Sequence, residues 1–181
     1  METMARSIGF GPFLKESLGT YYDILSSQKY ACDFIARYNE RNCAYALKKE
    51  MEYYAFENNE VLFYEKVDEL TLEKIEVIKD LFQKKHVDFV AESKDHMATS
   101  MYYVIEVDLP QHSEIISAIK RFRFYKSFKF GLEGWVNGSI ILIDTTTQKG
   151  VSNPFGKKEL KRLLKLHGKF IDKIVSQTTS I

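Results

Sequence analysis

The segment from Asn153 to Val175 constrains the fold most, because a helix there separates apolar from basic side chains along its whole length. At about 100° per residue, one helical face holds Leu160, Leu163, Leu164, His167, Phe170, Ile171, Ile174 and Val175. The opposite face holds Lys158, Lys161, Arg162, Lys165, Lys169 and Lys173. Asn153 is a suitable N-cap and Pro154 a suitable first helical residue. The rest of the chain must therefore supply an apolar layer on which this helix packs.

Alternating segments predict that this layer is a β-sheet. Residues 101–109 alternate at period two, with one face made of Met101, Tyr103, Ile105, Val107 and Leu109. Pro110 ends this strand. Residues 139–145 are rich in β-branched side chains and predict a second strand, and Lys149-Gly150 predicts a turn into a short strand at Val151. Residues 52–57 and 60–66 flank Asn58-Asn59, which predicts a β-hairpin.

Helical patterns precede and interrupt these strands. Residues 11–40 predict N-terminal helices, a short one through Leu14 to Leu25 and, after Gly19, a second with Tyr30, Ala31, Phe34, Ile35 and Tyr38 on one face. Thr71 predicts the cap of a helix that buries Ile75, Ile78 and Phe82 and ends near Lys85. Ser113 predicts the cap of a short helix with Ile115, Ile116 and Ile119.

Residues 121–130 alternate between aromatic and basic positions and predict a strand, although a helix continuing through Phe124 also fits. In the strand, Lys126 falls on the phenylalanine face, where a buried lysine needs a partner or a depressed pKa. A β-bulge or strand break that turns Lys126 outward is the alternative.

The order of these elements predicts one α+β domain over residues 1–181, with N-terminal helices, a mainly antiparallel sheet with helices packed on it, and a C-terminal basic amphipathic helix. No linker divides the chain. Cys32 and Cys43 are too few for a disulfide framework, and the sequence predicts neither a signal peptide nor a membrane span. These features predict an intracellular, cytoplasmic protein in a reducing compartment.

The formal net charge of +1 hides an uneven distribution. Residues 116–181 carry 13 Lys and Arg against 4 Asp and Glu, whereas the other 115 residues carry 13 against 21. Such asymmetry is typical of nucleic-acid or anionic-surface binding, since cations replace phosphate counterions and aromatic rings stack on unpaired bases. The predicted contact residues are Arg121, Arg123, Tyr125, Lys129, Lys158, Lys161, Arg162, Lys165, Lys169 and Lys173. The alternative is that the acidic and basic parts neutralise each other within one fold.

Two acidic motifs predict different chemistry. Residues 87–94, with Asp88 and the tripeptide Glu92-Ser93-Lys94, resemble the strand of the PD-(D/E)XK nuclease superfamily. That resemblance implies a Mg²⁺ site at Asp88 and Glu92, with Glu92 and Lys94 as catalytic residues. Glu106 and Asp108 form another carboxylate pair, placed on one strand face by the period-two rule, which suits a metal or acid–base work.

The remaining residue types favour binding over catalysis. The histidines have no spacing typical of a zinc site or a catalytic triad, and no phosphate-loop glycine pattern is present. The leading hypothesis is a non-enzymatic binding or regulatory protein, without cofactor, that engages nucleic acid through its basic C-terminal third. The second is an inhibitor, immunity or adaptor module that contacts an acidic protein surface or a second copy of itself. The third is the Mg²⁺-dependent nuclease.

Overall fold

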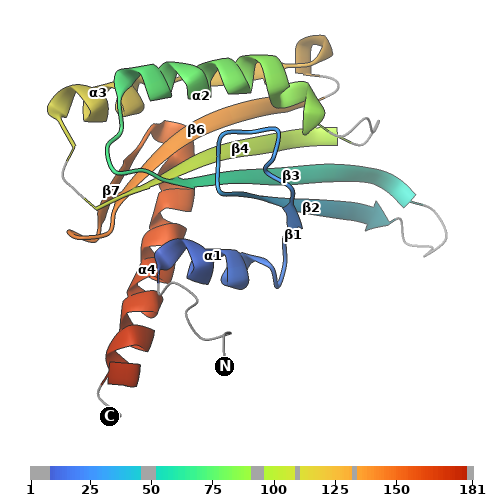
Figure 1. Ribbon diagram of the computed structural model, residues 1–181. Helices are drawn as coiled ribbons and strands as arrows, with labels where there is room; N and C mark the ends of the chain where they lie inside the picture. Colours follow the sequence, from blue (N-terminus) through green and yellow to red (C-terminus); the bar gives the residue numbers. More distant parts are fainter. Residues whose placement is uncertain (1–8, 46–51, 91–95, 109–110, 132–133, 179–181) are drawn as a thin grey trace.

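The computed structural model describes residues 9–45, 52–90, 96–108, 111–131 and 134–178. Figure 1 shows a single twisted sheet with helices on both of its faces. The helices are α1 (Phe10–Leu18), α2 (Leu72–Lys85), α3 (Ser113–Arg121) and α4 (Lys157–Thr178). The strands are β1 (Asp23–Leu25), β2 (Phe34–Tyr45), β3 (Glu52–Lys66), β4 (His96–Val107), β5 (Phe124–Ser127), β6 (Trp135–Asp144) and β7 (Lys149–Ser152). Short 3-10 helices span His86–Asp88, Lys129–Gly131 and Pro154–Gly156.

The sheet is mixed, in the order β1-β2-β3-β4-β6-β5, with β7 also paired to β6. Its centre is parallel: β3 pairs with β4, and β4 with β6, while the pairings of β1, β2, β5 and β7 are antiparallel. The parallel pairs need crossovers, which α2 and the α3–β5 segment provide. The predicted α+β class with a mostly antiparallel sheet is confirmed.

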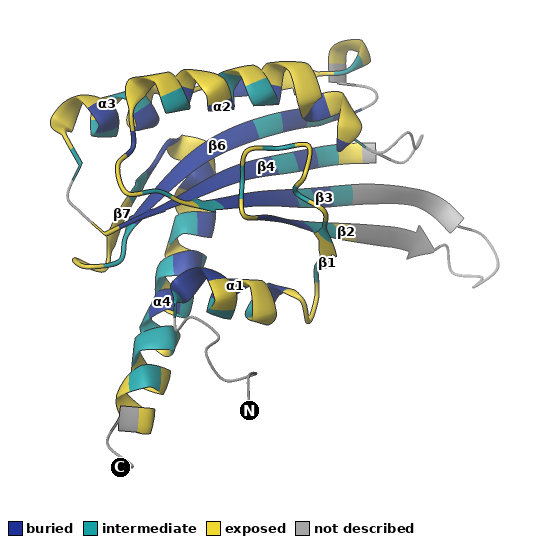
Figure 2. Ribbon diagram, in the orientation of Figure 1, coloured by how far each residue is buried: buried dark blue, intermediate teal, exposed yellow. Residues whose placement is uncertain are grey.

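The two faces of the sheet bury separate apolar layers, and Figure 2 shows the buried residues concentrated on the central strands. On one face α2 and α3 pack Ile75, Ile78, Phe82, Ile115 and Ile119 over Met101, Tyr103, Ile105 and Val107. On the other face α1 and α4 pack Phe10, Leu14, Leu18 and Leu163 over Leu62, Tyr64, Val104, Ile141 and Ile143. The alternation predicted for residues 101–107 is therefore confirmed.

The second N-terminal helix predicted within residues 11–40 is wrong. Helix α1 ends at Leu18, and the remainder forms β1, a loop and the start of β2. Phe34, Ile35 and Ala36 are all buried, because β2 has a helical layer or loop on each face. A strand buried on both faces reads as a continuous apolar run without alternation, which also fits a helical face.

The hairpin predicted at Asn58-Asn59 is also wrong. Residues 52–66 form the single long strand β3, in which Asn58 pairs with Glu40 and Asn59 with Asn39 of β2. The two asparagines lie where the register between β3 and β4 shifts, between Glu57 and Asn58. Residues typical of a turn mark an irregularity inside a strand at this position.

The strand predicted over residues 121–130 breaks into three pieces. Helix α3 continues to Arg121, β5 covers only Phe124–Ser127, and a 3-10 turn follows at Lys129. Lys126 is exposed, so the buried-lysine hypothesis is wrong and the outward alternative is confirmed. Phe122 and Phe124 are buried beside Phe82, which explains why aromatic side chains recur here.

Helix ends were predicted with mixed success. The Thr71 hydroxyl accepts a hydrogen bond from the Lys74 amide at 3.2 Å, and α2 ends at Lys85, as predicted. The residue in the cap position of α3 is His112 rather than Ser113. Asn153 does not cap with its side chain: it is buried, and its amide donates to the carbonyls of Phe122 and Gly138 at 3.3 and 3.0 Å.

His167 is a buried core residue of α4, 1% exposed, with its ring 4.9 Å from the ring of Phe10. Burial lowers the pKa of His167, opposed by the charge of Glu106. Because the unfolded chain then binds a proton that the folded chain does not, stability is fully present above about pH 6.5 and falls as the pH drops below that value. We expect chemical unfolding of His167→Phe to show a flatter decline between neutral and mildly acidic pH than the wild type. An equal decline in both proteins would contradict this assignment.

Candidate functional site

The lysines of α4 form a solvent-facing row. Lys157, Lys158, Lys161, Lys165, Lys169 and Lys173 are exposed. Within the described ranges, no acidic side chain forms an ion pair with any of them. Lys173 lies over the ring of Phe13, with its Nζ atom 5.6 Å from the ring centroid. Among the described residues, no acidic side chain therefore neutralises this face of the helix through an ion pair.

Arg162 is the exception among the basic residues of α4, because its guanidinium is bound by other residues of the fold. Its guanidinium grips Glu159 with two hydrogen bonds of 2.7 and 2.8 Å and donates to the Tyr22 hydroxyl at 3.2 Å. Tyr22 in turn donates to Glu60 at 2.5 Å. Burial acts to lower the pKa of Arg162, but the hydrogen bonds and charge of Glu159 raise it above its ordinary value. Arg162 thus ties α4 to the loop after α1.

A groove runs between the end of α1 and the lysine row. Its volume is about 250 Å³, and its lining includes Tyr21, Tyr22, Leu166, Lys165 and Lys169. Tyr21 is 77% exposed, so its ring is presented to solvent beside two lysines. Nothing in the sequence singled out Tyr21, since the pairing of its loop with α4 is a long-range contact.

The basic residues before β6 lie on the other side of the sheet. Arg121 and Arg123 line a groove of about 500 Å³ against α2, where Glu76 and Glu114 also lie. Arg123 donates to the carbonyls of Lys120 and Phe122 at 2.8 and 2.7 Å, so it satisfies the end of α3. Figure 1 shows α3 and α4 on opposite faces of the sheet.

Tyr125 and Lys129 follow these arginines along the chain. Tyr125 is 56% exposed on β5, and Lys129 begins a 3-10 turn with a positive φ of 43°. The predicted contact residues are therefore not one surface: the sheet separates Arg121 and Arg123 from the lysine row of α4.

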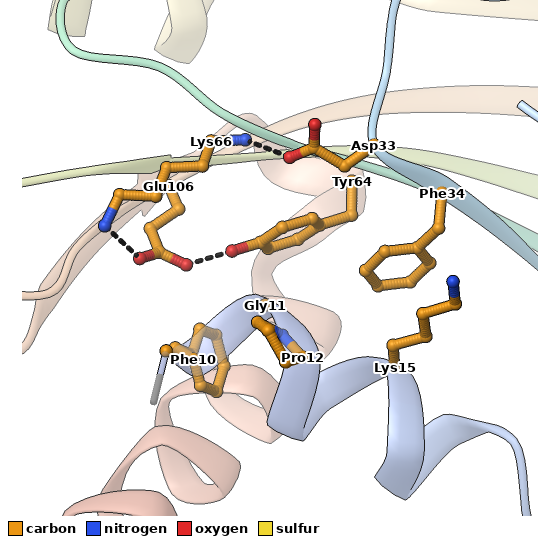
Figure 3. Close-up of a pocket in the computed structure, with 10 residues that line it drawn as sticks. Phe10, Gly11, Pro12, Lys15, Asp33, Phe34, Tyr64, Lys66 and Glu106 are labelled. Atoms are coloured by element: carbon orange, nitrogen blue, oxygen red, sulfur yellow. Dashed lines mark hydrogen bonds and ion pairs between the residues drawn. The ribbon is translucent and has the colours of Figure 1, made fainter. Parts of the chain in front are cut away.

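A second concave site lies where α1 begins, against the sheet. This pocket has a volume of about 500 Å³ and is lined by Gly9, Phe10, Gly11, Pro12, Lys15, Asp33, Phe34, Tyr64, Lys66 and Glu106. Figure 3 shows these side chains converging from α1, β2, β3 and β4.

A buried carboxylate lies at the inner end of the pocket. Glu106 is 2% exposed; it accepts a hydrogen bond from the Tyr64 hydroxyl and lies 3.1 Å from the Lys66 ammonium. Lys66 also contacts Asp108 at 2.9 Å. Burial and the charge of Glu106 raise the pKa of Tyr64, so the phenol stays protonated and donates. The hydrogen bond to Asp108 raises the pKa of Lys66, and the hydrogen bond from Lys66 lowers the pKa of Asp108.

The carboxylates predicted to bind a metal have other partners, or other positions, in the structure. Glu106 and Asp108 come together on one strand face as the period-two rule predicts, but the Lys66 ammonium lies between them, where a cation would have to bind. Among the described residues no group of three His, Cys, Asp or Glu side chains is placed to hold a metal ion. Asp88 lies in a 3-10 helix and not in the strand that the nuclease resemblance implies, while Glu92 and Lys94 lie outside the described residues.

No helix among the described residues is long and apolar enough to span a membrane. Searches of curated proteins and of solved structures found no significant match to the chain. One family does match, over residues 12–166, which include the four central strands, the pocket residues from Lys15 to Glu106 and the part of α4 up to residue 166. The chain therefore belongs to the family described as domain of unknown function DUF8052.

Proposed function

We propose that this protein binds single-stranded nucleic acid along α4, as a binding or regulatory protein rather than an enzyme. One observation carries the proposal: the exposed lysine row of α4 borders a groove that presents the ring of Tyr21. Cations that track a phosphate backbone, together with an aromatic ring that accepts a base, are the two elements of sequence-tolerant single-strand binding.

The spacing of the lysines suits a linear polyanion. Lys157, Lys161, Lys165 and Lys169 follow one another at four-residue intervals, so each ammonium lies about 6 Å further along the helix axis and about 40° around it. A row that turns this slowly keeps its charges on one side of the helix. The phosphates of one strand can then contact several lysines without leaving the surface.

Tyr21 favours an unpaired strand over a duplex. In a duplex the bases are stacked on each other and offer no free face, whereas a single strand lets one base leave the stack and lie on a side-chain ring. Tyr21 lies beside Lys165 and Lys169 in the groove, so a base on its ring and a phosphate on a lysine are within reach of one nucleotide.

Loss of the lysine charges should weaken binding by at least about tenfold and reduce the salt slope by about 2, since each phosphate contact on a single strand contributes about 0.7 to that slope. The variant is Lys161→Gln/Lys165→Gln/Lys169→Gln, titrated by fluorescence anisotropy with an oligothymidylate of about 20 nucleotides at several salt concentrations. The matched control, Lys79→Gln/Lys84→Gln/Lys85→Gln, removes the same charge from α2 on the opposite face. Equal losses from the two triple variants would show that only net charge matters and would reject the α4 site.

Tyr21→Ala separates nucleic acid from an acidic protein surface as the partner of this face. Loss of the ring should weaken oligothymidylate binding by about tenfold while leaving the salt slope unchanged, because stacking contributes about 1–3 kcal/mol and no charge. An unchanged affinity of Tyr21→Ala would show that no base stacks on Tyr21. If the wild-type protein binds no oligothymidylate at low salt, the nucleic-acid proposal is rejected altogether.

A further inference from the structure

The pocket at the start of α1 lies where ligands commonly bind in sheets with parallel strands. Tyr64 and Lys66 are among the last residues of β3, and Glu106 is the second-last residue of β4. These strands run parallel, so their carboxyl ends meet at this edge of the sheet. Crevices outside the carboxyl ends of parallel strands are the usual ligand sites of such sheets. The volume of about 500 Å³ is within the range of small-molecule pockets.

The walls of the pocket are apolar and rigid. The rings of Phe34 and Tyr64 stack with their centroids 4.9 Å apart and their planes 20° from parallel. Both are buried, as is Phe10 on the opposite side. A Cβ atom at Gly11 would lie 2.7 Å from the Tyr64 hydroxyl, so the absence of a side chain at Gly11 lets α1 approach this wall. The pocket thus offers aromatic surface to an apolar group.

The inner charges of the pocket are already satisfied. One Glu106 oxygen accepts a hydrogen bond from the Tyr64 hydroxyl, and the other faces the Lys66 ammonium, which Asp108 also contacts. A ligand therefore needs no charged group at the inner end of the pocket. Its charged groups have to pair with side chains elsewhere in the pocket that can still form hydrogen bonds.

Two such side chains line the pocket, one of each sign. Lys15 on α1 is exposed, and its ammonium contacts only the ring of Phe34, 5.9 Å from the centroid, among the described residues. Asp33, just before β2, accepts the Lys66 backbone amide on Oδ2 at 2.9 Å, and no hydrogen bond from a described residue reaches Oδ1. Lys15 and Asp33 do not pair with each other within ion-pair distance, although they line one cavity with the stacked rings.

We propose that this pocket binds a small zwitterion, a free α-amino acid with an apolar side chain. Its carboxylate pairs with Lys15, its ammonium group with Oδ1 of Asp33, and its side chain packs on Phe34 and Tyr64. The site is separate from the lysine row of α4, and its occupancy does not depend on nucleic-acid binding.

Calorimetric titration of the full chain with L-leucine, L-methionine and L-phenylalanine tests the proposal. At least one should bind, and Lys15→Gln and Asp33→Asn should each weaken it by at least about tenfold, the loss of one charge-assisted contact. Asparagine at position 33 keeps a carbonyl oxygen for the Lys66 amide, so this variant removes charge with little change to the fold. Lys120→Gln and Asp23→Asn, exposed residues away from the pocket, are the matched controls and should leave the affinity unchanged.

Analogues that lack one charge complete the test. Phenethylamine and hydrocinnamate should each bind at least about tenfold more weakly than L-phenylalanine, if that amino acid binds. If hydrocinnamate binds as well as the amino acid, and Asp33→Asn does not change the affinity, the pocket is an anion site and the zwitterion proposal is rejected. Absence of binding by all three amino acids at about 10 mM would overturn it as well. Should either variant fail to fold, chemical-shift changes of the Phe34 and Tyr64 rings in the wild type decide whether the amino acid lies in this pocket.

Discussion

Replacing Lys66 with methionine should lower the free energy of unfolding by about 3 kcal/mol at neutral pH, because the change leaves Glu106 buried without its cation. The asymmetry between the two carboxylates of the site produces the effect. The Glu106 side chain is 3% exposed and would lose its charged partner inside the fold, whereas Asp108 is 56% exposed and stays hydrated. The Tyr64 hydroxyl still donates to Glu106, which keeps the loss at the lower end of the range for a broken buried pair.

A double variant separates this cause from simple loss of packing. In Lys66→Met/Glu106→Gln the buried group is neutral and its amide oxygen still accepts a hydrogen bond from the Tyr64 hydroxyl, so most of the lost stability should return. Urea unfolding of the wild type, both single variants and the double variant gives the coupling energy directly. Asp108→Asn is the control and should cost less than about 1 kcal/mol, as expected for an exposed pair. If the double variant is no more stable than Lys66→Met, the lysine acts through its stem and not through its charge.

The sequence predicted the elements in which polar residues mark one face, and it failed where no polar residue marks either face of a strand. Strand β4 is buried on both faces from Met101 to Val107, but Glu106 and the following Asp108 lie on one face and make its period readable. The alternation of β4 and the capped helix α2 follow directly from residues 101–107 and from Thr71, and both are confirmed. Phe34 and Ala36 in β2 lie in the layer under α1 and α4, and Ile35 lies in the opposite layer with the loop residues Tyr30 and Cys32, so the three together show no period. The turn predicted at Asn58-Asn59 was wrong because these asparagines lie at a register shift within β3.

The candidate sites were predicted only in part, because much of their geometry depends on contacts between residues distant in the chain. The lysine face of α4 is a local feature of 3.6-residue periodicity, and all of its lysines except Lys157 were predicted from the sequence. Arg162 binds Tyr22, which binds Glu60, and both residues are distant from Arg162 in the chain. Arg121 and Arg123 lie on the opposite face of the sheet from α4 because the crossover after β4 places them there. The pocket joins α1, β2, β3 and β4, so only Glu106 and Asp108 of its network were predicted, and those from strand periodicity alone.

Gly138→Ala should destabilise the protein by about 3 kcal/mol, the upper part of the range for overpacking a core. Gly138 lies within β6 between Met101 of β4 and Phe124 of β5. A Cβ atom there would lie 2.6 Å from Phe82 Cδ2 and 2.9 Å from Phe124 Cδ1. Both rings are buried and pack on each other, with centroids 5.6 Å apart, so neither can move aside without opening the layer between α2 and the sheet. A glycine inside a strand marks such a close approach.

The contrast with Gly168 makes the reason for this loss measurable. Nothing lies within 4 Å of a Cβ atom built at Gly168 on α4, so Gly168→Ala should stabilise the protein by up to about 1 kcal/mol, the helix propensity difference between the two residues. Gly138→Ala should also cost less in a Phe82→Leu background, where a smaller side chain leaves room for the added methyl group, and the difference should exceed about 0.5 kcal/mol because the two residues are in contact. Urea unfolding of the four proteins in that cycle measures it. If the losses of stability in the cycle are additive, the backbone of β6 requires the glycine. A coupling energy that makes Gly138→Ala less costly in the Phe82→Leu background shows instead that contact with the Phe82 ring causes the loss.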